Sequence, residues 1–164
     1  VIENPGWTFP YWNDEIAAFK GEETAAADAL LLGRVTYEGF AAAWPNSEDE
    51  GAPYFNSVTK YVVSTTLDRA DWNNSHLIKS DVVAEIARLK DQPGQDIFVH
   101  GSGKLVQTLF QYDLVDSLRL LVYPVVLGTG QRLFGDGTTG TFRLVQSRVF
   151  SGGVVGLIYE PARG

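Results

Sequence analysis

The sequence contains no cysteine and no methionine among its 164 residues, and only two histidines. The absence of cysteine excludes disulfide bonds, thiolate metal ligands and a cysteine nucleophile, and it is compatible with a reducing cytoplasm. We therefore expect a cytoplasmic protein without a metal site.

Long apolar runs and an excess of positive charge are also missing. No run approaches the roughly 20 apolar residues that a membrane-spanning helix needs, so we expect no membrane partner. Thirteen Lys and Arg stand against 20 Asp and Glu, which gives a net charge of −7. Binding to nucleic acid depends on neutralising phosphates with Lys and Arg, so this balance argues against a nucleic-acid partner.

The sequence is that of a packed globular protein, with 45% hydrophobic residues and a length typical of one domain. Strand-like and helix-like segments alternate as far as residue 112, which predicts a mostly parallel sheet covered on both faces. Two closing strands joined by Ser151-Gly152-Gly153 predict an antiparallel hairpin at the C-terminal end. We therefore predict a single α/β domain over residues 1–164.

The predicted elements follow from apolar spacing, glycines and prolines. Strands are expected at 29–32, 60–64, 76–79, 96–100, 118–126, 141–150 and 154–160. Helices are expected at 13–27, 34–44, from Ser80 as a cap to before Pro93, and from 103 to 112. Residues 46–53 are polar and acidic and are expected to form a surface loop.

Three loops that follow predicted strands are candidates for binding an anion: residues 33–36, 64–66 and 101–103. Ligands of open α/β sheets lie outside the carboxyl ends of the strands, where helix N-termini present unpaired N–H groups. Two of these loops have a simpler interpretation, since Gly101 and Gly103 suit an ordinary tight turn and residues 64–66 suit capping of a strand end. None contains the full G-x-G-x-x-G or P-loop pattern, which disfavours those two nucleotide-binding families.

Four segments resemble parts of known reductases. Residues 31–38 (LLGRVTYE) resemble the G-R-x-T-[WYF]-E segment of dihydrofolate reductases, and residues 61–65 (YVVST) fall where those enzymes have a strand ending in Ser or Thr. Residues 97–104 and the string PVVLGTGQRLF at 124–134 are similar to the reductase domain of the bacterial riboflavin-biosynthesis enzyme RibD. The resemblance covers the chain from Val1 onward.

This resemblance implies a dihydrofolate-reductase-like fold, a three-layer α/β/α arrangement whose mixed, mostly parallel sheet ends in an antiparallel hairpin. It also implies a first strand before Val1, inside the sheet, that this sequence lacks. The family's homodimers lead us to expect a homodimer, with the apolar residues 118–126 as candidate contacts.

The resemblance further implies NADPH bound at the carboxyl edge of the sheet. Gly33, Arg34 and Thr36 would lie at the cofactor phosphates, and Gly101, Ser102, Gly103 and Lys104 would hold the pyrophosphate. Ser64 and Thr65 would lie near the adenosine 2′-phosphate, with Arg69 or Lys79 and Ser80 close by. Hydroxyl and cationic donors suit a 2′-phosphate, whereas NAD-specific sites carry an acidic residue on the ribose, so Asp68 is a signal against this assignment.

Glu15 is the candidate catalytic residue, because aligning Phe19 and Lys20 with dihydrofolate reductases places it where those enzymes carry their substrate-binding carboxylate. The alternative is that Asp14 and Glu15 simply stabilise a helix N-terminus. His100 either packs or contacts the cofactor, and we favour packing. Trp7, Phe9 and Trp12 are candidates for the wall of a substrate pocket.

The function that this resemblance implies is an NADPH-dependent reductase of a small heterocyclic, pyrimidine-like or pterin-like substrate, similar to the uracil reductase step of riboflavin biosynthesis. The chain lacks the H-x-E and P-C-x-x-C motifs of the zinc deaminase that accompanies this domain in bifunctional enzymes. No counterpart of the folate-binding arginine is found in residues 52–60. A non-catalytic nucleotide-binding module and a dihydrofolate or pterin reductase remain alternatives.

Overall fold

The computed structural model describes residues 5–162, which fall into two compact units. One unit comprises residues 21–106, and the other comprises the residues up to 20 and those from 107 onward. We describe each unit by itself. The expectation of one domain over residues 1–164 stays a prediction, and the strand expected before Val1 lies outside the described residues. Among the helices of residues 5–162, none is long and apolar enough to cross a membrane.

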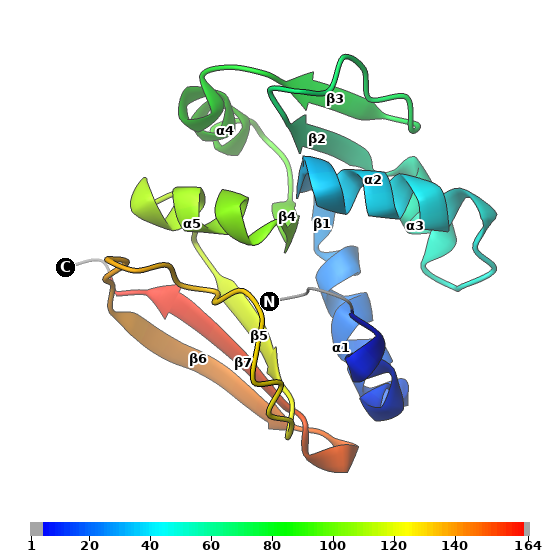
Figure 1. The fold of residues 1–164 in the computed structure, drawn as a ribbon, viewed down its shortest axis with the longest axis vertical. Helices are drawn as coiled ribbons and strands as arrows, with labels where there is room; N and C mark the ends of the chain where they lie inside the picture. Colours follow the sequence, from blue (N-terminus) through cyan, green and yellow to red (C-terminus); the bar gives the residue numbers. More distant parts are fainter. Residues whose placement is uncertain (1–4, 163–164) are drawn as a thin grey trace. The chain divides into compact units, whose positions relative to one another are not determined.

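The unit of residues 21–106 is built on a parallel four-stranded sheet with the order β3-β2-β1-β4 (Figure 1). Its strands are β1 (Ala27–Gly33), β2 (Thr59–Val63), β3 (Ser75–Ile78) and β4 (Asp96–Gly101). Its helices are α2 (Arg34–Ala43), α3 (Ala52–Ser57) and α4 (Val82–Lys90), with a 3-10 turn η2 at Trp44–Asn46, and it shares α1 (Asp14–Ala25) and α5 (Gly103–Gln111) with the other unit.

Strand β1 is the centre of this sheet. Leu30, Leu31 and Leu32 have exposed fractions of 0%, 1% and 0%. Neighbouring side chains of a strand point to opposite faces, so both faces of the sheet are covered, as the sequence predicted. On one of them Leu30, Leu32 and Val62 form a core with Tyr37 of α2 and Phe55 of α3.

The other unit contains an antiparallel three-stranded sheet with the order β5-β7-β6. Its elements are a 3-10 segment η1 (Pro5–Tyr11), the strands β5 (Leu118–Val122), β6 (Phe142–Val149) and β7 (Val155–Pro161), and a 3-10 turn η3 (Ser151–Gly153). Strands β6 and β7 form the predicted C-terminal hairpin. The described strands thus form two sheets, one parallel and one antiparallel, within the predicted α/β class.

The core of this second unit lies where α1 packs on the sheet. The side chain of Asn13 caps α1 by accepting a hydrogen bond from the Ile16 amide at 3.0 Å, as predicted. Ile16 and Phe19 are buried together with Phe150, and the rings of Phe19 and Phe150 are 5.5 Å apart. The predicted apolar stripe of this helix is confirmed.

Three sequence predictions about elements were wrong. Helix α3 was missed: the polar and acidic residues 46–53 were expected to form a loop, but α3 begins at Ala52, proline is tolerated in the first turn of a helix, and Phe55 buries its ring against Trp44. Strand β5 ends at Val122 rather than 126, because Pro124 has no N–H to pair. Ser80 does not cap α4, because Asp81, with a left-handed φ of 49°, is the residue before its first turn.

Candidate functional site

The carboxyl ends of the four parallel strands meet at one edge of their sheet. In the register of the strands, Gly33 lies opposite Val63, Val63 lies opposite Ile78, and Leu32 lies opposite Gly101. The segments that follow these strands are residues 33–36, 64–66, 79–80 and 101–104, which contain every predicted cofactor-binding residue. The topology therefore brings the predicted residues to the same edge.

Two of these segments contact each other through their glycines. A Cβ atom on Gly33 would lie 2.6 Å from Ser102 Oγ, which is far closer than such atoms approach. A Cβ atom on Gly101 would lie 3.1 Å from Thr36 Oγ1, and the φ of Gly101 is 140°, a value that side chains disfavour. Glycine suits both positions because a side chain of the other segment, Ser102 or Thr36, lies against the glycine backbone.

Two helices begin at this edge. Gly33 precedes α2 with extended backbone and offers no side-chain cap, so the N–H groups of the first turn have no partner from that residue. The carbonyl of Ser102 accepts a hydrogen bond from the Val106 amide at 3.0 Å, which starts α5. Unpaired N–H groups and the positive end of the helix dipole favour an anionic ligand here.

Ser64 and Thr65 play different parts in the segment after β2. Ser64 is buried, and its Oγ accepts hydrogen bonds from the amides of Thr66 and Leu67 at 3.2 and 3.1 Å. These two hydrogen bonds cap the end of β2, which is the simpler interpretation of Ser64. Thr65 is exposed, so its hydroxyl is accessible to a ligand.

Three cations of this region each pair with a carboxylate on the surface. The pairs are Arg34 with Glu38 at 2.9 Å, Arg69 with Asp71 at 3.0 Å, and Lys79 with Asp68 at 3.9 Å. Exposed pairs of this kind contribute only about 0–1 kcal/mol, so a cation can exchange its carboxylate for a phosphate at small cost. Asp68, the signal against a 2′-phosphate, is thereby the partner of a lysine. Ser80 and Lys104 are also exposed.

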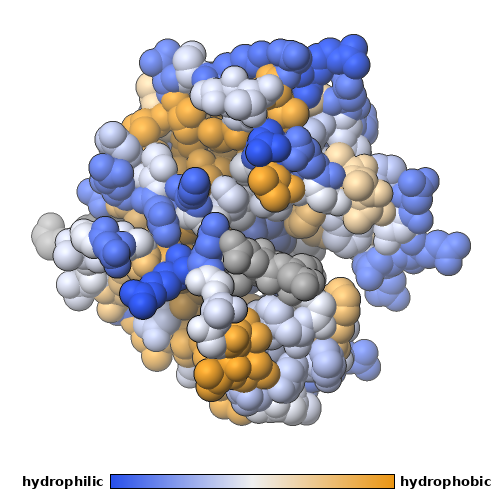
Figure 2. Space-filling model, viewed as in Figure 1, coloured by the Kyte–Doolittle hydropathy of each residue, from blue (hydrophilic) through white to orange (hydrophobic). Residues whose placement is uncertain are grey.

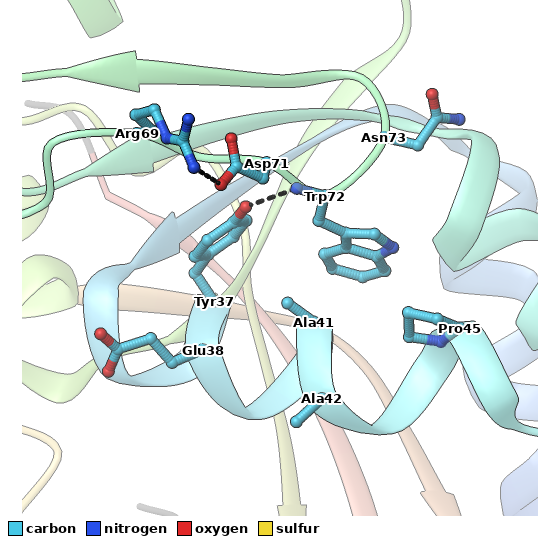
Figure 3. A pocket seen from close by; sticks show the side chains of 9 residues that line it. All are labelled: Tyr37, Glu38, Ala41, Ala42, Pro45, Arg69, Asp71, Trp72 and Asn73. Carbon is cyan, nitrogen blue, oxygen red and sulfur yellow. Dashed lines mark hydrogen bonds and ion pairs between the residues drawn. The ribbon is translucent and has the colours of Figure 1, made fainter.

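A hollow of about 590 Å³ borders this region along α2. Figure 3 shows Tyr37 and Ala41 of α2 on one side and Trp72 on the other, with the Arg69–Asp71 pair toward one end. The Tyr37 hydroxyl accepts a hydrogen bond from the Trp72 amide at 2.9 Å. The sequence did not reveal this hollow, because it depends on a contact between residues 35 positions apart.

Glu15 lies at the start of α1 in the other unit and is exposed. Its carboxylate accepts a hydrogen bond from the Ser151 amide at 2.6 Å, and Asn13 Nδ2 donates to the Ser151 carbonyl at 3.1 Å. Hydrogen bonds from the backbone and side chain of Ser151 hold the pKa of Glu15 below its usual value. Glu15 thus fixes the turn between β6 and β7, and its catalytic role stays a prediction.

The structure shows packing roles for some of the aromatic and histidine residues that the sequence singled out and leaves others exposed. The His100 ring packs against the rings of Phe98, Phe40 and Phe55, at centroid distances of 4.6, 5.6 and 5.7 Å. The preferred interpretation of His100 as a packing residue is confirmed. The Trp7 ring packs against Tyr123, whereas Phe9 and Trp12 are exposed, and their role in a substrate pocket stays a prediction.

The string at residues 124–134 forms the loop after β5. Gly128 and Gly130 have positive φ values of 74° and 132°, which explains why glycine stands at both positions. Gln107 Nε2 donates to the Arg132 carbonyl at 3.3 Å and so ties the loop to α5. Figure 2 shows an apolar patch over this loop, where Val126 is 94% exposed.

Known proteins resemble this chain in sequence. It is 35% identical over 139 residues to the uncharacterized protein YyaP of Bacillus subtilis (strain 168), covering 81% of this chain and 73% of that protein. It is 32% identical over 137 residues to the uncharacterized protein YwjB of the same organism, covering 79% and 74%.

Solved structures resemble it in fold. A putative riboflavin biosynthesis protein from Shewanella sp. PV-4 has a TM-score of 0.72 at 22% identity, covering 93% of this chain and 81% of that one. A pyrimidine reductase-like protein from Corynebacterium diphtheriae has a TM-score of 0.68 at 14% identity, covering 94% and 84%. Dihydrofolate reductase from Enterococcus faecalis, complexed with NADP(H), has a TM-score of 0.62 at 16% identity, covering 93% and 84%.

These likenesses confirm the dihydrofolate-reductase-like fold that the sequence predicted. The model of one protein family, described as the RibD C-terminal domain, matches residues 4–156. That range includes the four segments that carried the resemblance, at residues 31–38, 61–65, 97–104 and 124–134. The chain therefore belongs to the RibD C-terminal domain family.

Proposed function

We propose that this protein is an NADPH-dependent reductase of a small heterocyclic, pyrimidine-like or pterin-like substrate. The observation that carries the proposal is the contact between residues 33–36 and 101–103, which brings the N-termini of two helices to the same sheet edge. The names of its structural neighbours point the same way, since one is a pyrimidine reductase-like protein and another is a reductase complexed with NADP(H).

The residues of this edge fit the phosphates of the cofactor. Arg34, Thr36 and the first turn of α2 would lie at the phosphates of the pyrophosphate, which Gly101 to Lys104 and the first turn of α5 would hold. Because Gly33 has no side chain, the Ser102 hydroxyl lies directly beside its backbone, which brings that hydroxyl and the first turn of α2 to the same place. When bound, NADPH supplies the hydride, and these residues orient it.

The 2′-phosphate would lie at the segment after β2. Thr65 would donate its exposed hydroxyl, and Ser64 would keep that segment in shape through its two accepted hydrogen bonds. Arg69, or Lys79 with Ser80, would supply positive charge by leaving the exposed carboxylates with which the two cations now pair. Glu15 aligns with the substrate-binding carboxylate of dihydrofolate reductases. This alignment supports Glu15 as the residue that would bind the substrate and handle its proton.

One observation favours a second candidate, a nucleotide-binding module without turnover. The carboxylate of Glu15 is engaged by Ser151, and its lowered pKa keeps it ionised at neutral pH, whereas a proton donor works best with a pKa near the working pH. Under this alternative the cofactor binds and no substrate is reduced.

We also propose that the protein forms a homodimer and is located in the cytoplasm.

Titration with NADPH and NADH, followed by quenching of tryptophan fluorescence, tests the proposal. Thr65→Ala should weaken NADPH binding about tenfold, because a hydrogen bond to a charged group contributes about 1.5–3 kcal/mol. It should leave NADH binding and the Tm unchanged, since Thr65 is exposed and NADH lacks the 2′-phosphate. Ser147→Ala, at an exposed position on β6, is the matched control and should change neither affinity.

The outcomes separate the candidates. If wild type binds neither NADPH nor NADH, the cofactor assignment is wrong. Binding of NADPH followed by its oxidation with a pyrimidine or pterin substrate supports the reductase and identifies the substrate class. Binding without oxidation in such a screen favours the module without turnover.

A further inference from the structure

Lys60 on β2 is a fully buried lysine, with an exposed fraction of 0%. Its Nζ donates to the Val58 carbonyl at 2.7 Å and to the Asn73 carbonyl at 3.0 Å. The same atom lies 4.2 Å from the centre of the Trp72 ring. Two carbonyl dipoles and an aromatic face therefore surround the ammonium group, and none of these three contacts is a carboxylate.

Burying an ammonium group is costly unless every donor is used, so this arrangement requires an explanation. The Val58 contact is local, only two residues away, whereas the contacts with Trp72 and Asn73 reach across to the end of the segment after β2. Arginine and lysine side chains prefer the faces of tryptophan rings, so the ring contact adds to the two hydrogen bonds. Lys60 thus links the start of β2 to residues 72–73.

The rest of that segment is held at its ends. Ser64 caps its beginning, and further hydrogen bonds hold its end: Trp72 Nε1 donates to Asn56 Oδ1 at 3.0 Å, and Asn73 Nδ2 donates to the Asn56 carbonyl at 2.9 Å. Between these anchors lie Thr65 and Arg69, both exposed. The conformation of the exposed residues therefore depends on the two anchored ends.

We propose that Lys60 is a positioning residue that holds residues 72–73, and through them the segment of Thr65 and Arg69, in the conformation that binds the 2′-phosphate of the cofactor. The inference rests on the proposed function. Lys60 itself touches no ligand. Trp72 and Asn73 also line the hollow beside α2, so Lys60 fixes that wall as well (Figure 3).

Lys60→Met tests the proposal, because methionine keeps an unbranched apolar chain and removes all donors. The Asn73 carbonyl then loses its buried donor, and we expect the segment to shift toward water. The expected result is at least a tenfold rise in the Kd for NADPH with no more than a twofold change for NADH. A purely structural role would weaken both cofactors alike or neither. Lys60→Arg, which restores donors and stacks on tryptophan, should recover most of the NADPH affinity.

Amide hydrogen exchange gives a readout that does not involve the cofactor. Lys60→Met should increase exchange at least tenfold at the Trp72 amide, which bonds the Tyr37 hydroxyl, while the amides of β1 remain protected. Lys90→Met, in the last turn of α4, is the control and should leave exchange in residues 64–73 and both affinities unchanged.

The two proposals fail in different ways. If wild type does not bind NADPH, the proposed function is wrong. If wild type binds NADPH and Lys60→Met binds it equally well, or binds NADPH and NADH equally weakly, the inference about Lys60 is wrong. Should Lys60→Met fail to fold, Trp72→Leu removes the ring and the bond to Asn56, and the inference then requires at least a threefold loss for NADPH alone.

Discussion

The parallel and antiparallel units use their charged residues in opposite ways. In the parallel unit, Lys60 is buried and donates to two backbone carbonyls outside the strands, while the predicted cofactor-binding residues lie at the carboxyl edge of the sheet. In the antiparallel unit, the predicted functional residue Glu15 is exposed, and its carboxylate binds a turn. Exposure alone therefore does not distinguish the predicted functional residues, whereas strand topology brings the predicted cofactor-binding residues to one edge of the sheet.

The two residues also share a direction of pKa shift for opposite physical reasons. Burial disfavours the ammonium form and lowers the pKa of Lys60 to about 8. Hydrogen bonds from Ser151 favour the carboxylate form and lower the pKa of Glu15. The charge of Lys60 therefore costs stability at neutral pH, and the charge of Glu15 contributes to it.

The largest expected effect is the pH dependence of Lys60. Its folded pKa of about 8 lies below its ordinary value of 10.5, so the unfolded state binds more protons between these values and stability rises with pH. Relative to Lys60→Met, the free energy of unfolding of wild type should rise by about 3 kcal/mol between pH 7 and pH 10.5. Urea unfolding of both proteins at several pH values measures it. A difference that stays constant with pH would mean that Lys60 titrates as an ordinary lysine.

The next effect compares two glycines within the parallel unit. Gly101→Ala should destabilise the protein by about 1–3 kcal/mol, because a side chain is strained at a φ of 140° and would approach Thr36. Gly39→Ala, in the interior of α2 with nothing within 4 Å of the added Cβ, should stabilise it by about 0.5–1 kcal/mol. Thermal unfolding of the two variants measures both changes in stability, which should have opposite signs. NADPH affinity should fall only for Gly101→Ala, and an equal loss for both variants would contradict a special role for the glycine segments.

The sequence predicted the part of the site that depends on topology. Alternating strands and helices placed residues 33–36, 64–66 and 101–104 after parallel strands, and parallel strands end at the same edge. Strand topology does not predict the contact between Gly33 and Ser102, because this contact depends on the distance between two segments almost 70 residues apart in the chain.

Two of the missed features depend on tertiary contacts. Lys60 begins a strand-like run, and a lysine in a sequence carries no signal of burial, so its contact with Trp72 was not predicted. Helix α3 forms because Phe55 finds Trp44 as a stacking partner, although its local sequence begins like a loop. The run 118–126 is apolar except for Arg119, and its strand ends at Val122 because Pro124 has no N–H to pair, which is a local feature of the sequence. Local patterns thus predicted most of the elements, whereas helix α3 and the burial of Lys60 depend on packing.

The smallest expected effect concerns Glu15. It distinguishes a catalytic role of this carboxylate from a purely structural contact with the turn at Ser151. Glu15→Gln keeps an acceptor for the Ser151 amide and removes the charge, so it should lower the Tm slightly at pH 7. Because the folded pKa lies below the ordinary value of 4.5, this stabilisation is present above pH 4.5 and is lost as the pH falls through the folded pKa. Circular dichroism at pH 7 and pH 3 should therefore show a gap in Tm that closes in acid.

Glu48→Gln, in the exposed loop before α3, is the control for this gap and should show none at either pH. Turnover then decides the role of Glu15, because a turn contact and a catalytic contact respond differently. If Glu15→Gln keeps the NADPH affinity and loses turnover, the carboxylate serves the substrate in addition to the turn. If turnover persists while the gap in Tm behaves as expected, Glu15 is structural, and the proton for the reaction comes from another group or from water.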